Sequence, residues 1–453
     1  TTCFFIHCMR LTETNMFFMN KIFRYLMLVF LYVVLLGING FSQSSPQVYK
    51  GAQIIPISGE PITNGILIIE NGKISAVGDS TTRIPNRADI HDVSGKVIMP
   101  GLVDTHSHIG DGDGGDRSAT LHPDVRIMDT INPRSKSFKR ALAGGITSVN
   151  VMPGSGHLMS GQTVYLKLRS ANAIEDMLLY IDDEKTIYGG LKMANGTNPR
   201  GNPPSAGTRG KAAAMVRELY IKAQEYKAKI DAADGDETKM PPRDLGMETL
   251  VEVLEGKRTV HNHTHKHQDI LTAIRLADEF GYKLVLQHVS EAWKVADEIA
   301  ASGYPASIIT LDSFGGKVEA MDLKNSNGKY LEDAGVLVGF HTDDGITDSR
   351  LFLRSAAMGV REGMSRKKAL EAVTIANAVM MEIDNRVGTL EKGKDADFII
   401  LTGDPFSVYT HVEETWIEGE KVWDRKIKED RKFATGGYQI YPGLIHTHHQ
   451  EGE

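Results

Sequence analysis

Residues 102–109 read "LVDTHSHI" and place His106 and His108 two positions apart behind an apolar lead-in, "KVIMPG". In a β-strand, residues i and i+2 project from the same face, so both imidazoles point to one side if this stretch is a strand. Two converging imidazoles at the end of a strand suit a borderline divalent metal such as Zn²⁺. The pair alone is a weak signal, and a metal site needs further ligands from elsewhere in the chain.

Seven further apolar runs follow this stretch, at residues 146–152, 162–168, 190–194, 258–265, 283–289, 306–311 and 336–344. Amphipathic helical segments such as "DILTAIRLADEFG" separate the later runs, and alternating strands and helices predict a parallel sheet. Eight such strands over roughly 250–300 residues predict an α/β fold, a (β/α)8 TIM barrel across residues 100–385. A doubly wound open sheet is the alternative, but the glycine-rich dinucleotide fingerprint expected after its first strand is missing.

Short β-like runs flank the barrel, at residues 48–99 and 386–432. We expect these two ends to pair into one small β-sandwich, because unpaired sheet edges seek partners. Residues 196–246 separate the fourth and fifth strands by far more than a usual crossover, and they are predicted to form either a lid over the barrel mouth or a solvated insertion. The polar tail, residues 433–453, is predicted to be flexible.

The first part of the chain has the order of a secretory signal peptide. Lys21 and Arg24 precede the apolar run at 25–38, and small and polar residues follow it. We predict that translation starts at Met19, that residues 1–18 are an upstream extension, and that residues 19–42 are removed after export to the periplasm or the extracellular space. The apolar run is shorter than the about 20 residues of a membrane span, and a retained anchor is the alternative.

Composition excludes several classes of protein. Hydrophobic residues make up 41% and charged residues 24% of the 453 residues, as in a globular protein with a large core. The net charge of −7 argues against a nucleic-acid partner. Cys3 and Cys8 are the only cysteines, and both precede Met19. The mature protein should therefore contain no disulfide, thiolate metal site or cysteine nucleophile.

Other predicted strand ends carry further residues of metal-ligand type. His288 lies near the end of the 283–289 run, and Asp343 near the end of the 336–344 run. The 258–265 run contributes three histidines on one face, His261, His263 and His265. Barrel enzymes build their sites at the C-terminal ends of the strands, so these side chains should surround one central point. The tract "HNHTHKH" at 261–267 could instead be a surface chelating run.

Several of these motifs resemble the amidohydrolase superfamily, and the resemblance covers nearly all of residues 48–430. They are "VIMPGLVDTHSH", the aspartate in "TDD" and the returning segment "VGTLEKGKDADFIIL". The segment "HTHKHQDILTAIRLADEFG" is similar to secreted relatives of imidazolonepropionases and of barrel-type prolidases. The resemblance implies one or two divalent metal ions, with zinc favoured, and the ligands His106, His108, His263, His288 and Asp343. It favours His263 on the fifth strand and leaves His261 and His265 as rivals.

The resemblance also bears on Lys192, in "GLKMA" on the fourth strand. Members with two metals carry a lysine there that reacts with CO2 to give a bridging carbamate, so Lys192 is a further predicted metal ligand. Lys167, on the third strand, is a weaker candidate. The alternative is a site for one metal ion with Lys192 packed nearby.

Four residues are predicted to contact the substrate: His157 after the second strand, Arg200 after the fourth, His265 and His341. Arg200 would suit a substrate carboxylate, because a guanidinium can donate two parallel hydrogen bonds to it. His341 should share the face of Asp343 on the eighth strand.

The predicted reaction is hydrolysis of an amide, cyclic amide or dipeptide C–N bond in a small molecule. A metal ion activates water and polarises the scissile carbonyl. Asp343 is the predicted general base, and His288 is the other predicted catalytic residue. The alternatives are an Xaa-Pro dipeptidase-like peptidase, a deaminase, a phosphotriesterase and a non-catalytic exported metal-binding barrel. We expect no membrane partner after signal cleavage, and a homo-oligomer stays open.

Overall fold

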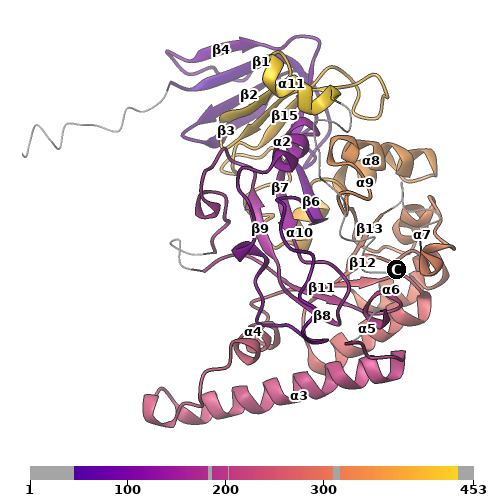
Figure 1. Ribbon diagram of the computed structural model, residues 1–453. Helices are drawn as coiled ribbons and strands as arrows, with labels where there is room; N and C mark the ends of the chain where they lie inside the picture. The colour runs from indigo at the N-terminus through magenta and orange to yellow at the C-terminus, as the bar shows by residue number, and fades with distance from the viewer. Residues whose placement is uncertain (1–44, 182–185, 202–203, 310–316, 437–453) are drawn as a thin grey trace, which may run out of the picture. The chain divides into compact units, whose positions relative to one another are not determined.

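A computed structural model describes residues 45–181, 186–201, 204–309 and 317–436 (Figure 1). The predicted upstream extension and signal peptide, and nearly all of the predicted tail, lie outside the described residues. Among the helices of the described part, none has the length and apolar character to cross a membrane.

Strands from both ends of the described chain share one eight-stranded sheet, drawn in indigo and yellow in Figure 1. Its main path runs β17-β16-β15-β5-β1-β2-β3, and β4 pairs with β1. The strands are β1 (Gln47–Ile54), β2 (Ile62–Glu70), β3 (Lys73–Gly78), β4 (Asp89–Asp92), β5 (Val97–Pro100), β15 (Phe398–Leu401), β16 (Val412–Ile417) and β17 (Glu420–Asp424). Tyr49, Phe398 and Trp416 pack ring against ring in its core, with centroids 5.0–5.5 Å apart. The small β-domain built from both ends of the chain is confirmed.

The barrel strands form two further sheets. One has the order β6-β7-β9, and the other the order β14-β13-β12-β11-β10-β8. Their bounds are β6 (Leu102–Ser107), β7 (Ile146–Val151), β8 (Met159–Gln162), β9 (Val164–Lys167), β10 (Leu191–Ala194), β11 (Val260–Thr264), β12 (Leu284–His288), β13 (Ala306–Ile308) and β14 (Val338–Phe340). Each of the eight predicted runs contains one of these strands.

Backbone hydrogen bonds join the two sheets at both edges. On one side, Thr163 donates to Gly190 O over 2.9 Å, at the start of β10. On the other side, Asp343 donates to His106 O over 2.9 Å, where β14 and β6 end. The β6–β7 pair and the β10–β14 series are parallel, as an α/β barrel requires.

Two strands, one predicted and one not, depart from the predicted all-parallel arrangement. β9 pairs with β7 antiparallel, and β8, which the sequence did not predict, pairs with β10 antiparallel. Parallel neighbours need a crossover of a dozen or more residues, usually a helix. Residues 152–163 between β7 and β9 contain β8 but no helix. The chain therefore turns back at this point and does not cross over.

Ten α-helices of the described residues accompany these sheets. They are α2 (Lys136–Ala143), α3 (Arg209–Ala233), α4 (Leu245–Leu254), α5 (His267–Phe280), α6 (Ala296–Ser302), α7 (Asn327–Asp333), α8 (Phe352–Arg361), α9 (Arg366–Glu371), α10 (Ile375–Met380) and α11 (Lys428–Thr435). The long α3 lies in the inserted segment and packs against α4 and α5. Its buried Tyr220 stacks on Phe280 and Tyr282, with ring centroids 5.0 Å away in both cases. The lid role of the insertion stays a prediction.

A buried ion-pair network joins β9 to the terminal β-domain. Lys167 is fully buried, pairs with Asp395, and lies 3.1 Å from Asp397 Oδ1 and 3.1 Å from Glu418 Oε1. Arg386 also pairs with Asp395 and Glu418, at 2.9 and 3.2 Å. A buried ammonium needs such partners to offset its desolvation. Lys167 therefore serves this junction, and the proposal that it is the carbamate lysine is wrong.

Candidate metal centre

Side chains of metal-ligand type converge at the C-terminal ends of the barrel strands. The structure brings together residues from β6, β10, β11, β12 and the segment after β14: His106, His108, Lys192, His263, His265, His288, His341 and Asp343. All but His108 are buried, and the His108 side chain is 13% exposed. The cluster therefore opens toward His108.

His106, His108 and Asp343 form the tightest group. The two Nε2 atoms of the histidines are 3.3 Å apart, and Asp343 Oδ1 lies 3.0 Å from His108 Nε2 and 3.4 Å from His106 Nε2. His108 Nδ1 lies 2.8 Å from the carbonyl of Met152. Because a carbonyl only accepts, Nδ1 carries the proton and Nε2 presents its lone pair to the group.

Lys192 lies inside the same cluster, as predicted from the sequence. Its side chain is fully buried, with Nζ 3.0 Å from His106 Nε2 and 3.2 Å from Met152 Sδ. Burial, and second the nearby Lys192 charge, hold the pKa of His106 well below its ordinary value. The lysine therefore lies beside the first-strand ligand His106, at the edge of the centre.

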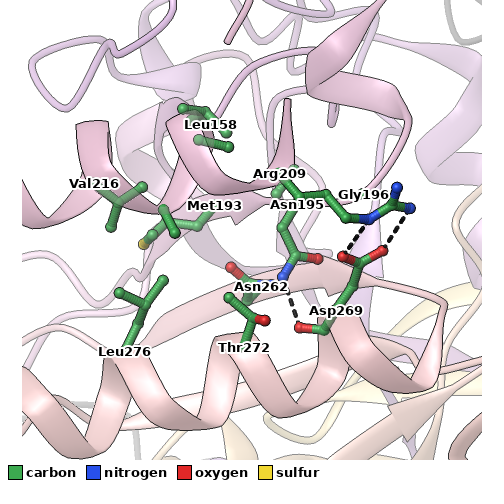
Figure 2. A pocket seen from close by; sticks show the side chains of 13 residues that line it. Leu158, Met193, Asn195, Gly196, Arg209, Val216, Asn262, Asp269, Thr272 and Leu276 are labelled. Carbon is green, nitrogen blue, oxygen red and sulfur yellow. Dashed lines mark hydrogen bonds and ion pairs between the residues drawn. The ribbon is translucent and has the colours of Figure 1, made fainter. Parts of the chain in front are cut away.

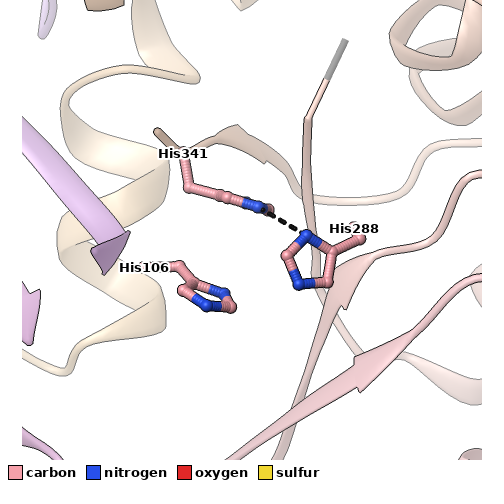
Figure 3. Close-up of side chains that lie close together, drawn as sticks. All are labelled: His106, His288 and His341. Atoms are coloured by element: carbon pink, nitrogen blue, oxygen red, sulfur yellow. Dashed lines mark hydrogen bonds between the residues drawn. The ribbon is translucent and has the colours of Figure 1, made fainter. Parts of the chain in front are cut away.

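His288 and His341 lie close to His106 (Figure 3). His341 Nε2 is 3.0 Å from His288 Nδ1, and the His341 ring stacks on His106 with centroids 5.0 Å apart. His341 Nδ1 lies 2.9 Å from Ser307 Oγ. His341 is fully buried, its nitrogens lie next to His288 and Ser307, and it groups with His106 and His288 as a possible metal-ligand set, so its predicted substrate contact stays a prediction.

The structure resolves most of the choice among the three histidines of β11. His261 lies one layer deeper than the cluster, where Tyr165 Oη and the Gln287 amide reach its two nitrogens at 2.8 and 3.0 Å. His261 is therefore a core residue in this structure. His263 packs on His288 with centroids 4.4 Å apart, and His265 stacks on His288 at 5.0 Å.

Glu319 is a buried carboxylate that the sequence reasoning missed. It lies in a 3₁₀ turn, Val318–Ala320, in the part of the chain that follows β13. Its Oε1 is 3.5 Å from His263 Nε2 and 4.0 Å from His265 Nε2. The only sequence signal was its place downstream of the seventh strand, where barrel enzymes carry site residues.

Burial favours the neutral form, which a metal ligand needs, in the fully buried histidines of the centre. Burial lowers the pKa of His263 to about 4 and that of His341 to about 3, and it holds the pKa values of His265 and His288 well below the ordinary value. Neutral imidazole is the ligating species. Within the described residues, His263 Nδ1, His265 Nε2 and His288 Nε2 are buried and have no hydrogen-bond partner. Buried polar atoms normally have partners, so these residues fit a divalent metal ion.

The backbone is strained at two of the strand ends. His288 and Val289 have φ of 71° and 40°, and Asp343 has φ of 48°. A β-branched residue such as valine is a clear outlier in this left-handed region. Strained backbone conformations concentrate at functional sites, where the surrounding structure holds them.

Asp104 ties the first and eighth strands together behind the ligands. Its Oδ1 accepts the backbone N–H of Thr342 at 3.1 Å and that of His106 at 3.2 Å, and its Oδ2 accepts the Thr342 hydroxyl at 2.5 Å. Burial raises the pKa of Asp104 to about 7, although these hydrogen bonds lower it. Asp104 thereby fixes the backbone on either side of the centre, at His106 and next to Asp343.

A small pocket lies beside β10 and β11, between α3 and α5 (Figure 2). Asp269 accepts two hydrogen bonds from Arg209, at 2.7 and 3.0 Å, and its carbonyl accepts one from Asn195 at 2.8 Å. The pocket volume of about 20 Å³ is that of a single water molecule. It cannot be the substrate site.

Two predicted substrate contacts lie on loops around the strand ends. Arg200 is partly exposed and donates to Gly207 O at 3.3 Å within its own loop. His157 is buried and packs edge-on against His122, with centroids 5.5 Å apart. Neither contact reaches the cluster, and the substrate roles of both residues stay predictions.

The fold and the cluster define a barrel enzyme, and comparison with known proteins agrees. The family model described as the amidohydrolase family matches residues 296–423. An amidohydrolase structure from Thermotoga maritima is 33% identical, with a TM-score of 0.77, over 84% of this chain and all of the other.

Two curated relatives are more distant. The amidohydrolase tasK of Hapsidospora irregularis is 26% identical over 80% of this chain, which spans only 40% of that protein. The imidazolonepropionase of Deinococcus radiodurans is 24% identical over 81% of this chain and 92% of its own length. The chain belongs to the amidohydrolase superfamily, an enzyme superfamily whose members use divalent metals. The predicted TIM-barrel class is confirmed.

Proposed function

We propose that the protein is a metal-dependent hydrolase of amide or cyclic-amide C–N bonds in small molecules. The observation that carries this proposal is the group of His106, His108 and Asp343, whose facing nitrogen and oxygen atoms lie 3.0–3.4 Å apart. These residues, with His263, His288 and Lys192 as further ligands, would hold one or two ions, with zinc favoured. A bound ion supplies Lewis-acid polarisation of the carbonyl and lowers the pKa of water.

Asp343 is the proposed proton carrier. Its carboxylate borders the open side of the cluster beside His108, and its backbone is fixed by the hydrogen bond to His106 O. It would accept a proton from the attacking water and deliver it to the leaving nitrogen. His288 Nδ1 lies 4.0 Å from Asp343 Oδ2, and we propose His288 as the second catalytic residue because of this proximity to the base.

The substrate class follows from the relatives and the predicted contacts. The imidazolonepropionase relative and the resemblance to prolidases favour a cyclic amide or a dipeptide. Arg200 and His157 would contact the substrate from the loops at the strand ends. We also propose that the protein acts after export, because residues 19–42 have the pattern of a signal peptide.

A substrate screen with metal-loaded protein tests the proposal. N-acyl amino acids, Xaa-Pro dipeptides and cyclic ureides cover the substrate class, and release of product is followed by mass spectrometry. We expect turnover that a chelator abolishes and added Zn²⁺ restores. Turnover that persists after complete metal removal would refute metal dependence. Hydrolysis of a phosphotriester, or release of ammonia from a nucleobase, would favour the alternative reactions.

A further inference from the structure

A second group of metal-ligand side chains lies beside the His106 group. It consists of His263, His265 and Glu319, which are 1–3% exposed. One ligand atom of each lies within 4.8 Å of those of the other two. Two imidazoles and one glutamate are a ligand set found in zinc proteins.

Two of the three ligands, His265 and Glu319, are held by a contact behind the ligand atom. His265 Nδ1 lies 2.7 Å from Ser290 Oγ, which leaves Nε2 directed at Glu319. Glu319 Oε2 accepts the backbone N–H of Thr197 at 2.8 Å. Metal-binding histidines and carboxylates are typically oriented by such outer contacts.

The backbone before Thr197 is shaped to the carboxylate. Gly196 has a φ of 82°, and a Cβ at this position would lie 2.7 Å from Glu319 Oε2. Only glycine adopts this conformation freely and also permits the close approach. The 195–197 loop and Glu319 therefore fit one another closely.

The group offers a carboxylate and an unpartnered ring nitrogen, as a cation site requires. Glu319 Oε1 faces the Nε2 atoms of His263 and His265, at 3.5 and 4.0 Å, so a carboxyl oxygen and two ring nitrogens meet at one buried point. Within the described residues, His265 Nε2 has no hydrogen-bond partner although it is buried. A buried charge is normally paired or coordinated to a metal.

We propose that His263, His265 and Glu319 hold a divalent cation of their own, next to the ion of the His106 group. This inference rests on the proposed function and deepens it, because it gives the second of the two proposed ions His265 and Glu319 as ligands in addition to His263. The test of this site counts bound ions per chain, so its result does not depend on whether a substrate is found.

Metal analysis of the full chain tests the site. Apo-protein is equilibrated with Zn²⁺ alone, freed of excess ion by gel filtration, and its ions per chain are measured by inductively coupled plasma mass spectrometry. Glu319→Gln and His265→Asn should each lose one ion per chain relative to wild type. His106→Asn should lose the other ion and keep the one that depends on Glu319.

Glu291→Gln is the matched control. Glu291 is also a buried carboxylate beside α5, but it binds Lys266, His267 and Lys294. This variant should keep the wild-type ion count. Circular dichroism shows which variants are folded, and His265→Asn serves if Glu319→Gln does not fold.

The site is overturned if a folded Glu319→Gln or His265→Asn variant keeps the wild-type count and affinity. It is also overturned if wild type holds a single ion that His106→Asn removes. Loss of one ion in these variants with no turnover by wild type on any substrate would refute the proposed function and leave the site intact.

Discussion

Replacement of Lys167 by methionine should destabilise the junction between the barrel and the terminal β-domain. Methionine keeps much of the side-chain length but removes the charge that three carboxylates face. Breaking a buried ion pair by removing one partner costs about 3–5 kcal/mol. Asp395 keeps Lys73 and Arg386, and Glu418 keeps Arg169 and Arg386. We therefore expect the free energy of unfolding to fall by about 3 kcal/mol, the lower end of this range. Most of that loss should come from the buried carboxyl of Asp397.

The loss should depend on pH in a defined direction. Burial already raises the pKa of Asp397, and the charge of Lys167 opposes this. Without Lys167 the folded-state pKa rises further above the unfolded value of about 3.9. A carboxyl whose folded pKa is raised loses stability as the pH rises above its unfolded pKa. The difference between wild type and variant should therefore be larger at pH 7.5 than at pH 5.

Urea unfolding followed by circular dichroism at these two pH values measures the effect. Lys283→Met is the control, because Lys283 forms an exposed pair with Glu382 and should change the free energy of unfolding by less than about 1 kcal/mol. Adding Asp397→Asn to Lys167→Met should recover part of the loss. A loss below about 1 kcal/mol, or an equal loss at both pH values, would refute this account of the network.

Three further predictions concern the centre and the first residues. Asp343→Asn keeps size and shape but removes the proton acceptor, so kcat should fall at least about a hundredfold, and near-normal turnover would assign the proton to another group. Lys192→Ala should lose bound metal and activity together, with partial rescue by a small carboxylic acid and bicarbonate. Unchanged metal content in that variant would rule out a bridging carbamate. Mass spectrometry of protein from its native host should find a mature chain that begins near Gln43, and an intact 25–38 segment would contradict export by signal cleavage.

Strand periodicity was sufficient to predict much of the centre. The i, i+2 rule placed His106 and His108 on one side, and strand ends pointed to His288 and Asp343 because barrel strands converge there. The same rule could not separate His261 from His263, because residues that share a face still differ in depth. Only the hydrogen bonds of His261 to Tyr165 and Gln287 show that it lies in the core.

The misses have physical reasons as well. Glu319 lies in a turn, where no periodicity indicates the direction of a side chain. The antiparallel course of β9 follows from the lack of a helix between β7 and β9, a signal present in the sequence but outweighed by the apolar pattern of the run. Alternation gave the face of His341, but its full burial depends on how Ser307 and His288 pack around it.

The pairing of β5 with β15 has a consequence for how the chain is made. Ile98 pairs with Ile400, so this edge of β5 has no partner until about 300 further residues have been synthesised. At the usual 5–20 residues per second, that edge waits about 15–60 s on the ribosome. Unpaired apolar edges are templates for association between chains. Since only Gly101 separates β5 from β6, a chain that stops before residue 398 leaves an unprotected strand directly ahead of His106 and His108. The last strands to be made thus complete the support of the first metal ligands.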